Sequence, residues 1–189
     1  MALSFHHLIV GGQRSGKSRQ AERLARQWLN APAPRRVTMV ATAIAGDDEM
    51  RARIARHQSD RPEGVHTVEC PLNLTQKLSE QAAPDHLLIV DCLTLWLTNW
   101  LMPMSGAVDR EGWLRERAAL LAALPDLASP VVFVSNEVGW GVSPISPEVR
   151  GFVDELGWLN QAVAQRCETL TLMVAGQPWS RPVEHEGAL

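Results

Sequence analysis

Short apolar runs alternate along this chain with longer segments in which apolar residues recur every three or four positions. The predicted strands are residues 5–10, 37–43, 65–70, 86–91, 131–135 and 169–174. The predicted helices are residues 16–29, 48–57, 72–81, 93–101, 111–124 and 150–164. This alternation predicts one α/β domain over residues 1–189, a mostly parallel sheet flanked by helices, with a frayed polar tail from about residue 178.

Composition narrows the functional classes. With 46% hydrophobic and 21% charged residues, the chain is expected to form a packed core. A net charge of −3 without a basic block argues against nucleic-acid binding, and no run approaches the ~20 apolar residues of a membrane span. Cys70, Cys92 and Cys167 are too widely spaced to indicate a zinc or disulfide framework. Free thiols, and an amino terminus unlike a signal peptide, predict a cytoplasmic protein.

The strongest chemical signal is a glycine-rich loop between the first predicted strand and the first predicted helix. It reads Gly11-Gly12-Gln13-Arg14-Ser15-Gly16-Lys17-Ser18 and fits the P-loop pattern G-x-x-x-x-G-K-[ST]. Glycines let backbone N–H groups converge on phosphate oxygens, and the helix amino terminus adds partial positive charge. We expect Lys17 to reach the β- and γ-phosphates and Ser18 to bind Mg²⁺; the alternative is a chance glycine turn.

A carboxylate ends the predicted strand 86–91. Asp91 follows four aliphatic residues, a pattern typical of the Walker B aspartate that helps to hold Mg²⁺. The alternative is that Asp91 caps the next helix, and both roles are compatible. That helix carries an apolar stripe from Leu93 to Leu101, which indicates either core packing or an oligomer interface. The glycine-rich segment 136–142 follows another strand, where ligands bind in open α/β sheets.

Histidines at two places bear on the chemistry. His57 lies on the apolar face of the predicted helix 48–57, for which Asp47 is the expected cap. From periodicity alone, a histidine at the edge of the core is favoured over a functional one. His6 and His7 stand at the first strand. We interpret them as polar residues at the entrance of the strand rather than as a pair of metal ligands, because no third ligand is near in the sequence.

A set of short motifs, taken in order, resembles one known family. Besides the P-loop, the motifs are Ala41-Thr42-Ala43, Asp47-Asp48-Glu49-Met50, Arg53-Ile54 with His57, Arg61-Pro62, Glu69-Cys70, Asp91-Cys92-Leu93-Thr94 with Thr98-Asn99, Asn136-Glu137-Val138-Gly139 and Asn160-Gln161. Together they resemble the bifunctional adenosylcobinamide kinase/adenosylcobinamide-phosphate guanylyltransferase (CobU) family over residues 7–178. The resemblance implies a RecA-like P-loop NTPase-type fold and a homo-oligomer, typically a trimer.

The resemblance also implies two reactions of cobalamin biosynthesis. The enzyme phosphorylates adenosylcobinamide with ATP or GTP, and then transfers GMP from GTP to adenosylcobinamide phosphate, which gives adenosyl-GDP-cobinamide and pyrophosphate. The GMP passes through a histidine that matches His57. The nucleotide contacts implied are Gly11–Ser18, Ala41, Thr42, Ala43, Gln58, Ser59, Asp60, Arg61, Glu69 and Asp91. Two positions depart from the family pattern: Gln58, where many members carry a basic residue, and Trp140, which is bulkier than expected.

The chemistry of His57 suits this role. A free imidazole has a pKa of ~6.5, so most of it is neutral and nucleophilic at pH 7. A covalent intermediate would split a difficult attack between two phosphates into two displacements. Two other hypotheses stay open: a plain P-loop small-molecule kinase in which His57 is structural, and a nucleotide-dependent switch that binds a protein partner.

Overall fold

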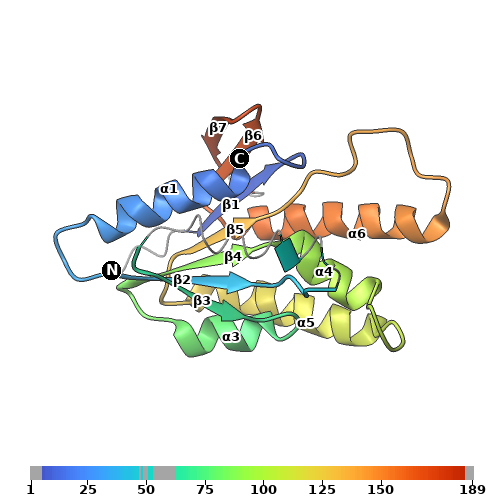
Figure 1. Ribbon diagram of the computed structural model, residues 1–189, viewed down its shortest axis with the longest axis horizontal. Coiled ribbons are helices and arrows are strands. Elements are labelled where there is room, and N and C mark those ends of the chain that lie inside the picture. Colours follow the sequence, from blue (N-terminus) through green and yellow to red (C-terminus); the bar gives the residue numbers. More distant parts are fainter. Residues whose placement is uncertain (1–5, 47, 49–50, 53–62, 186–189) are drawn as a thin grey trace.

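The computed structural model describes residues 6–46, 48, 51–52 and 63–185 of the chain (Figure 1). A seven-stranded sheet lies at its centre, and its strands are β1 (His6–Gly11), β2 (Arg36–Ala41), β3 (Val65–Glu69), β4 (His86–Asp91), β5 (Val131–Val134), β6 (Thr169–Val174) and β7 (Gln177–Pro182). The helices are α1 (Lys17–Leu29), α3 (Leu74–Gln81), α4 (Leu93–Leu101), α5 (Arg110–Ala123) and α6 (Pro147–Ala164), with a short 3-10 turn η1 (Leu124–Asp126).

The strand order across the sheet is β3-β2-β4-β5-β1-β6-β7. All neighbouring strands are parallel except β6 and β7, which confirms the predicted mostly parallel α/β fold. The residues from Leu87 to Val90 in β4 are all buried, as a strand covered on both faces requires. The register places Asp91 opposite Ala41 of β2 and opposite Val134 of β5, so these central strands end together at one edge.

Side chains that alternate along the strands form two hydrophobic cores, one on each face of the sheet. On one face, strand residues such as Ile9 pack with Ala21 and Ala25 of α1. Helices α3, α4, α5 and α6 cover the other face (Figure 1). There the fully buried rings of Trp96 and Trp113 meet edge to face, with centroids 4.9 Å apart. The apolar stripe of α4 therefore packs into the core.

The prediction of a frayed polar tail is wrong, because Gln177–Pro182 forms strand β7, antiparallel to β6. A two-residue turn joins the strands. Ala175 (φ 49°) and Gly176 (φ 79°) both have positive φ, as a type I′ hairpin turn requires. The two prolines of β7 argue against a strand in the sequence, but an edge strand tolerates them because one of its sides faces solvent.

Helix α6 begins at Pro147 rather than at the predicted residue 150. Ser146 caps the helix by accepting a hydrogen bond from the backbone N of Val149 (3.5 Å). Proline fits the first helical position because its missing N–H is not needed there. The predicted helix 48–57 and its cap Asp47 lie mostly outside the described residues.

His6 and His7 are buried parts of β1, with exposed fractions of 2% and 5%, so the predicted polar entrance is wrong. His6 accepts a hydrogen bond from the backbone N of Val131 at Nδ1 (3.2 Å) and donates from Nε2 to the carbonyl oxygen of Leu124 (2.8 Å). His7 Nε2 lies 2.7 Å from Thr171 Oγ1 of β6. Both histidines therefore hold neighbouring segments to β1.

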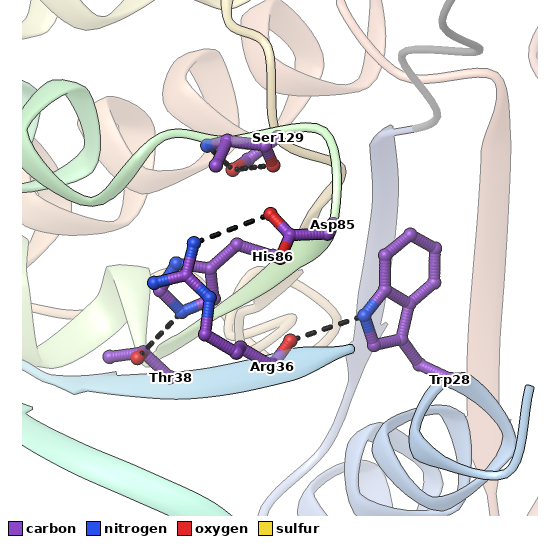
Figure 2. Close-up of polar contacts among 7 residues, drawn as sticks. Trp28, Arg36, Thr38, Asp85, His86 and Ser129 are labelled. Atoms are coloured by element: carbon purple, nitrogen blue, oxygen red, sulfur yellow. Dashed lines mark hydrogen bonds and ion pairs between the residues drawn. The ribbon is translucent and has the colours of Figure 1, made fainter. Parts of the chain in front are cut away.

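Polar contacts also tie the amino ends of the strands together, at the edge opposite the P-loop. His86 Nε2 of β4 lies 2.8 Å from Thr38 Oγ1 of β2, and Arg36 forms an exposed ion pair with Asp85 at 3.3 Å (Figure 2). Trp28 Nε1 donates to the carbonyl oxygen of Arg36 (3.1 Å), which attaches α1 to the sheet (Figure 2). These polar groups are engaged in holding the fold together.

Candidate active site

The carboxyl ends of the parallel strands bring separate segments of the chain to one edge of the sheet. The last strand residues are Gly11 (β1), Ala41 (β2), Glu69 (β3), Asp91 (β4) and Val134 (β5). Ligands of open α/β sheets bind in the crevice outside this edge. The structure thus gathers the P-loop, the segment 41–43, Glu69 and Asp91 on the same edge. His57 and the contacts Gln58–Arg61 lie outside the described residues.

The P-loop has the predicted context, with β1 ending at Gly11 and α1 beginning at Lys17. Gly16 caps the helix in the left-handed region (φ 101°), where glycine avoids the strain of a side chain. A Cβ on Gly11 would lie 2.5 Å from the carbonyl oxygen of Met173 of β6, so a side chain cannot fit there. The loop therefore turns tightly against the sheet and leads directly into the amino terminus of α1, the end of a helix at which phosphates bind.

Lys17 lies over the loop that precedes it. Its Nζ donates to the carbonyl oxygens of Gly11 (3.0 Å) and Gly12 (2.7 Å), and only 8% of the residue is exposed. These two carbonyls hold the ammonium group against the first residues of the P-loop. A triphosphate cradled by the loop would meet this charge directly, which matches the predicted role of Lys17.

Ser18 and Asp91 fit a magnesium ion by their chemistry. Ser18 lies half-buried in the first turn of α1, and the half-buried carboxylate of Asp91 ends β4. Hydroxyl and carboxylate oxygens are the ligands that Mg²⁺ prefers, and it usually takes one or two protein groups together with substrate phosphates. The alternative role of Asp91 as the cap of the next helix is wrong, because the capping position of α4 is Cys92.

Thr42 clamps the ends of β2 and β4 together. Its backbone N donates to the carbonyl oxygen of Asp91 (3.1 Å). Its buried hydroxyl accepts from the backbone N of Cys92 (2.9 Å) and donates to the carbonyl oxygen of Cys92 (2.7 Å). The contacts of Thr42 therefore fix the backbone at Asp91 and Cys92. The carbonyl oxygen of Thr42 also accepts a hydrogen bond from Asn99 Nδ2 (2.8 Å).

Glu69 lies at the far end of the same edge. Strand β3 is separated from β1 by β2, β4 and β5, and at ~4.8 Å between neighbouring strands this places Glu69 about 19 Å from the P-loop strand. The side chain is exposed. Glu69 can therefore meet a nucleotide held by the P-loop only at the end remote from the β- and γ-phosphates.

A second polar cluster follows β5. The sequence analysis places its residues in family motifs and in a ligand-lining loop but gives no single residue a chemical role. Asn136 donates to Thr94 Oγ1 from its backbone N (2.9 Å) and from Nδ2 (3.1 Å). Asn160 Nδ2 of α6 donates to the carbonyl oxygen of Asn136 (3.1 Å) and to Glu137 Oε1 (3.3 Å). Burial raises the pKa of Glu137 above its ordinary value. In the sequence, this cluster is marked by an amide and an acid, Asn136 and Glu137, that follow a buried strand.

The loop after Glu137 borders a hollow of about 270 Å³ between the loop and α6. Its lining residues are Val138, Gly139, Gly141, Val142, Ser143, Pro144, Arg150, Val153 and Asp154. Trp140 in the same loop is 70% exposed. The predicted glycine-rich loop thus lines a hollow whose other wall is α6.

The parallel sheet, the strand–loop–helix turn and the position of Lys17 define a P-loop nucleotide-binding protein. The family model described as cobinamide kinase / cobinamide phosphate guanyltransferase matches residues 7–180. The chain belongs to this family.

Curated relatives match almost the whole chain. The bifunctional adenosylcobalamin biosynthesis protein CobP of Pseudomonas aeruginosa is 49% identical over 171 residues, which cover 90% of this chain and 94% of the relative. The proteins named CobU of Salmonella typhimurium and Escherichia coli are 38% and 36% identical over 178 residues, which cover 89% of this chain and 95% of each relative. Among the residues that the structure describes, no helix is both long and apolar enough to cross a bilayer.

Proposed function

We propose that this protein catalyses two consecutive transfers in cobalamin biosynthesis. It phosphorylates the hydroxyl of adenosylcobinamide with ATP or GTP, and then transfers GMP from GTP to the resulting phosphate, releasing pyrophosphate. The observation that carries the proposal is the P-loop with Lys17 at the carboxyl edge of the sheet, in a chain that matches the family over residues 7–180.

Both transfers need a triphosphate held in one position. The P-loop backbone and the Lys17 ammonium bind the phosphates and offset the negative charge that develops on them during transfer. Ser18 and Asp91 hold Mg²⁺, which neutralises phosphate charge when it is bound. Thr42 keeps Asp91 in place through the clamp described above. Ala41, Ala43 and Glu69 contact other parts of the nucleotide.

His57 is the proposed carrier of GMP. Its imidazole nitrogen attacks the α-phosphorus of GTP, the bond to the bridging oxygen breaks, and pyrophosphate leaves. A phosphate oxygen of adenosylcobinamide phosphate then attacks the same phosphorus, and the phosphorus–nitrogen bond breaks. The support is the placement of Arg53-Ile54 and Arg61-Pro62 around His57 in a member of this family. Gln58, Ser59, Asp60 and Arg61 are the proposed neighbours of the guanosine nucleotide.

The assembly and location are proposals of the same kind. We propose a homotrimer in the cytoplasm. Large apolar side chains that are exposed in the single chain, such as Val142 (98%), Ile145 (96%) and Trp179 (61%), support an interface between subunits. The buried free thiols Cys70, Cys92 and Cys167 fit a reducing compartment. Sedimentation analysis of the purified protein tests the trimer, and a monomer at micromolar concentration would contradict it.

Product analysis tests the proposed function. The purified protein is incubated with adenosylcobinamide, ATP, GTP and Mg²⁺, and the corrinoids are followed by mass spectrometry. The expected sequence is adenosylcobinamide, its phosphate, and then adenosyl-GDP-cobinamide. Accumulation of the phosphate without the GDP product would indicate a plain kinase. Nucleotide hydrolysis without any corrinoid product would indicate a nucleotide-dependent switch.

A further inference from the structure

Glu137 lies between the P-loop and the predicted magnesium ligand Asp91. Strand β5, which leads into it, lies between β1 with the P-loop and β4 with Asp91. The backbone N of Glu137 donates to the carbonyl oxygen of Gly11 (3.2 Å), and Lys17 Nζ donates to that same oxygen (3.0 Å). Glu137 is therefore joined through one shared oxygen atom to the lysine that we place on the triphosphate.

The Glu137 carboxylate is held at one oxygen atom. Asn160 Nδ2 donates to Oε1 (3.3 Å) and also to the carbonyl oxygen of Asn136 (3.1 Å), so the amide sets the direction of the carboxylate. No hydrogen bond from another described residue reaches Oε2. The second oxygen atom is thus available to a group that enters from the site.

Two buried side-chain oxygens near the end of β5, one of them on the amide that holds this carboxylate, also lack partners. Asn160 is 6% exposed and Ser135 is fully buried, and neither Asn160 Oδ1 nor Ser135 Oγ has a hydrogen-bond partner among the described residues. Unpaired buried polar atoms are rare and call for an explanation. A substrate hydroxyl or a water molecule that enters beside Glu137 would supply the missing partner.

We propose that Glu137 is the general base of the phosphoryl transfer and that Asn160 positions it, an inference that rests on the proposed function. Oε2 removes the proton of the substrate hydroxyl while the hydroxyl oxygen attacks the γ-phosphorus. A new phosphorus–oxygen bond forms, the bond from the γ-phosphorus to the β–γ bridging oxygen breaks, and the nucleoside diphosphate leaves with that electron pair. The glutamic acid then returns its proton to solvent.

The electrostatic setting supports this role. Desolvation raises the pKa of Glu137, and the Asn160 hydrogen bond opposes it. A carboxylate with a raised pKa is a stronger proton acceptor near neutral pH. Charged groups on the elements around it include Lys17 in the P-loop and Asp91 at the end of β4. Helix α6 adds Glu148, Arg150, Asp154 and Glu155.

The matched pair Glu137→Gln and Glu148→Gln tests the proposal in the full chain. Glutamine keeps the hydrogen bond to Asn160 but cannot accept a proton, whereas Glu148 is an exposed acid on the first turn of α6. General base catalysis typically contributes about 10²–10⁴-fold, so we expect Glu137→Gln to lower the kinase kcat by that factor and to abolish the acid limb of its pH profile. Nucleotide affinity, and GMP transfer to adenosylcobinamide phosphate supplied ready-made, should stay near wild type, as should all activities of Glu148→Gln.

Two further variants separate the role of the Glu137 carboxylate from that of Asn160, which positions it. Glu137→Asp keeps a carboxylate and should retain more kinase activity than Glu137→Gln. Asn160→Ala should lower the kinase kcat by about tenfold and shift the acid limb, because the carboxylate is present but no longer held.

The outcomes distinguish this inference from the proposed function. A kinase kcat of Glu137→Gln near wild type, or an equal loss of kinase and GMP transfer with weakened nucleotide binding, would overturn the role of Glu137 alone. A wild-type protein that does not phosphorylate adenosylcobinamide would overturn both. Selective loss of the kinase step, with thermal stability unchanged, would establish the base.

Discussion

The buried histidine of β1 makes the stability of this protein depend on pH. His7 is 5% exposed, and burial lowers its pKa from 6.5 to about 4. Because the unfolded chain binds a proton at this residue more readily, the free energy of unfolding falls as the pH drops from about 6.5 to about 4. One pKa unit corresponds to ~1.36 kcal/mol, so the loss attributable to His7 is about 3 kcal/mol. That is a large part of the ~5–15 kcal/mol that stabilises a typical domain.

Urea denaturation at several pH values between 7 and 4 measures this effect. His7→Gln retains a polar side chain next to Thr171 but cannot titrate. The difference in unfolding free energy between wild type and variant therefore isolates the contribution of His7 from that of the other titratable groups. We expect the wild type to lose about 3 kcal/mol more than His7→Gln between pH 7 and pH 4. His66→Gln, at an exposed position of β3, is the matched control and should follow the wild type.

A nuclear magnetic resonance titration of the His7 ring provides a direct second measurement on the wild-type protein. A folded-state pKa near 4 is expected from its burial. Parallel stability curves for wild type and His7→Gln, or a ring that titrates near 6.5, would refute the reasoning that desolvation controls this residue.

Two further predictions concern the site. Lys17→Ala should lower both transfer rates by about 10²–10³-fold, because it removes a charge-assisted contact to the phosphates. Lys77→Ala on α3 is the control and should leave both rates unchanged. Near-normal turnover of Lys17→Ala in steady-state assays would contradict the role of the loop. Asp91→Asn should lower activity at limiting Mg²⁺ and recover part of it at high Mg²⁺, with thermal stability retained; activity independent of the Mg²⁺ concentration would show that Asp91 is not a metal ligand.

Most of the fold follows from local patterns, because continuous apolar strands such as Val131–Val134 and the P-loop pattern carry their own signals. The exceptions have physical reasons. Strand β7 forms because a tight turn after β6 returns the chain to the sheet, against the preference of its two prolines. Helix α6 begins earlier than its apolar periodicity indicates, because Ser146 caps it just before Pro147.

The functional site likewise contains residues that the sequence reveals and residues that only the packing reveals. The P-loop and Asp91 were predictable because their chemistry is encoded in consecutive residues. The pairing of Glu137 with Asn160 was not, because it depends on how α6 packs beside the end of β5. The second role of Thr42, as a clamp on Cys92, likewise depends on the parallel pairing of β2 and β4. The role of His57 stays a prediction.

The fate of GMP tests the central claim most directly. The protein is incubated with GTP labelled at the α-phosphate, denatured, digested and mapped by mass spectrometry, and a parallel sample is chased with adenosylcobinamide phosphate. We predict an acid-labile, alkali-stable GMP adduct on His57 that passes to the corrinoid during the chase and that is absent from His57→Asn, a variant that keeps kinase activity. GMP on His6, His7, His66, His86, His185 or Lys17, or guanylyl transfer by His57→Asn at the wild-type rate, would contradict the account.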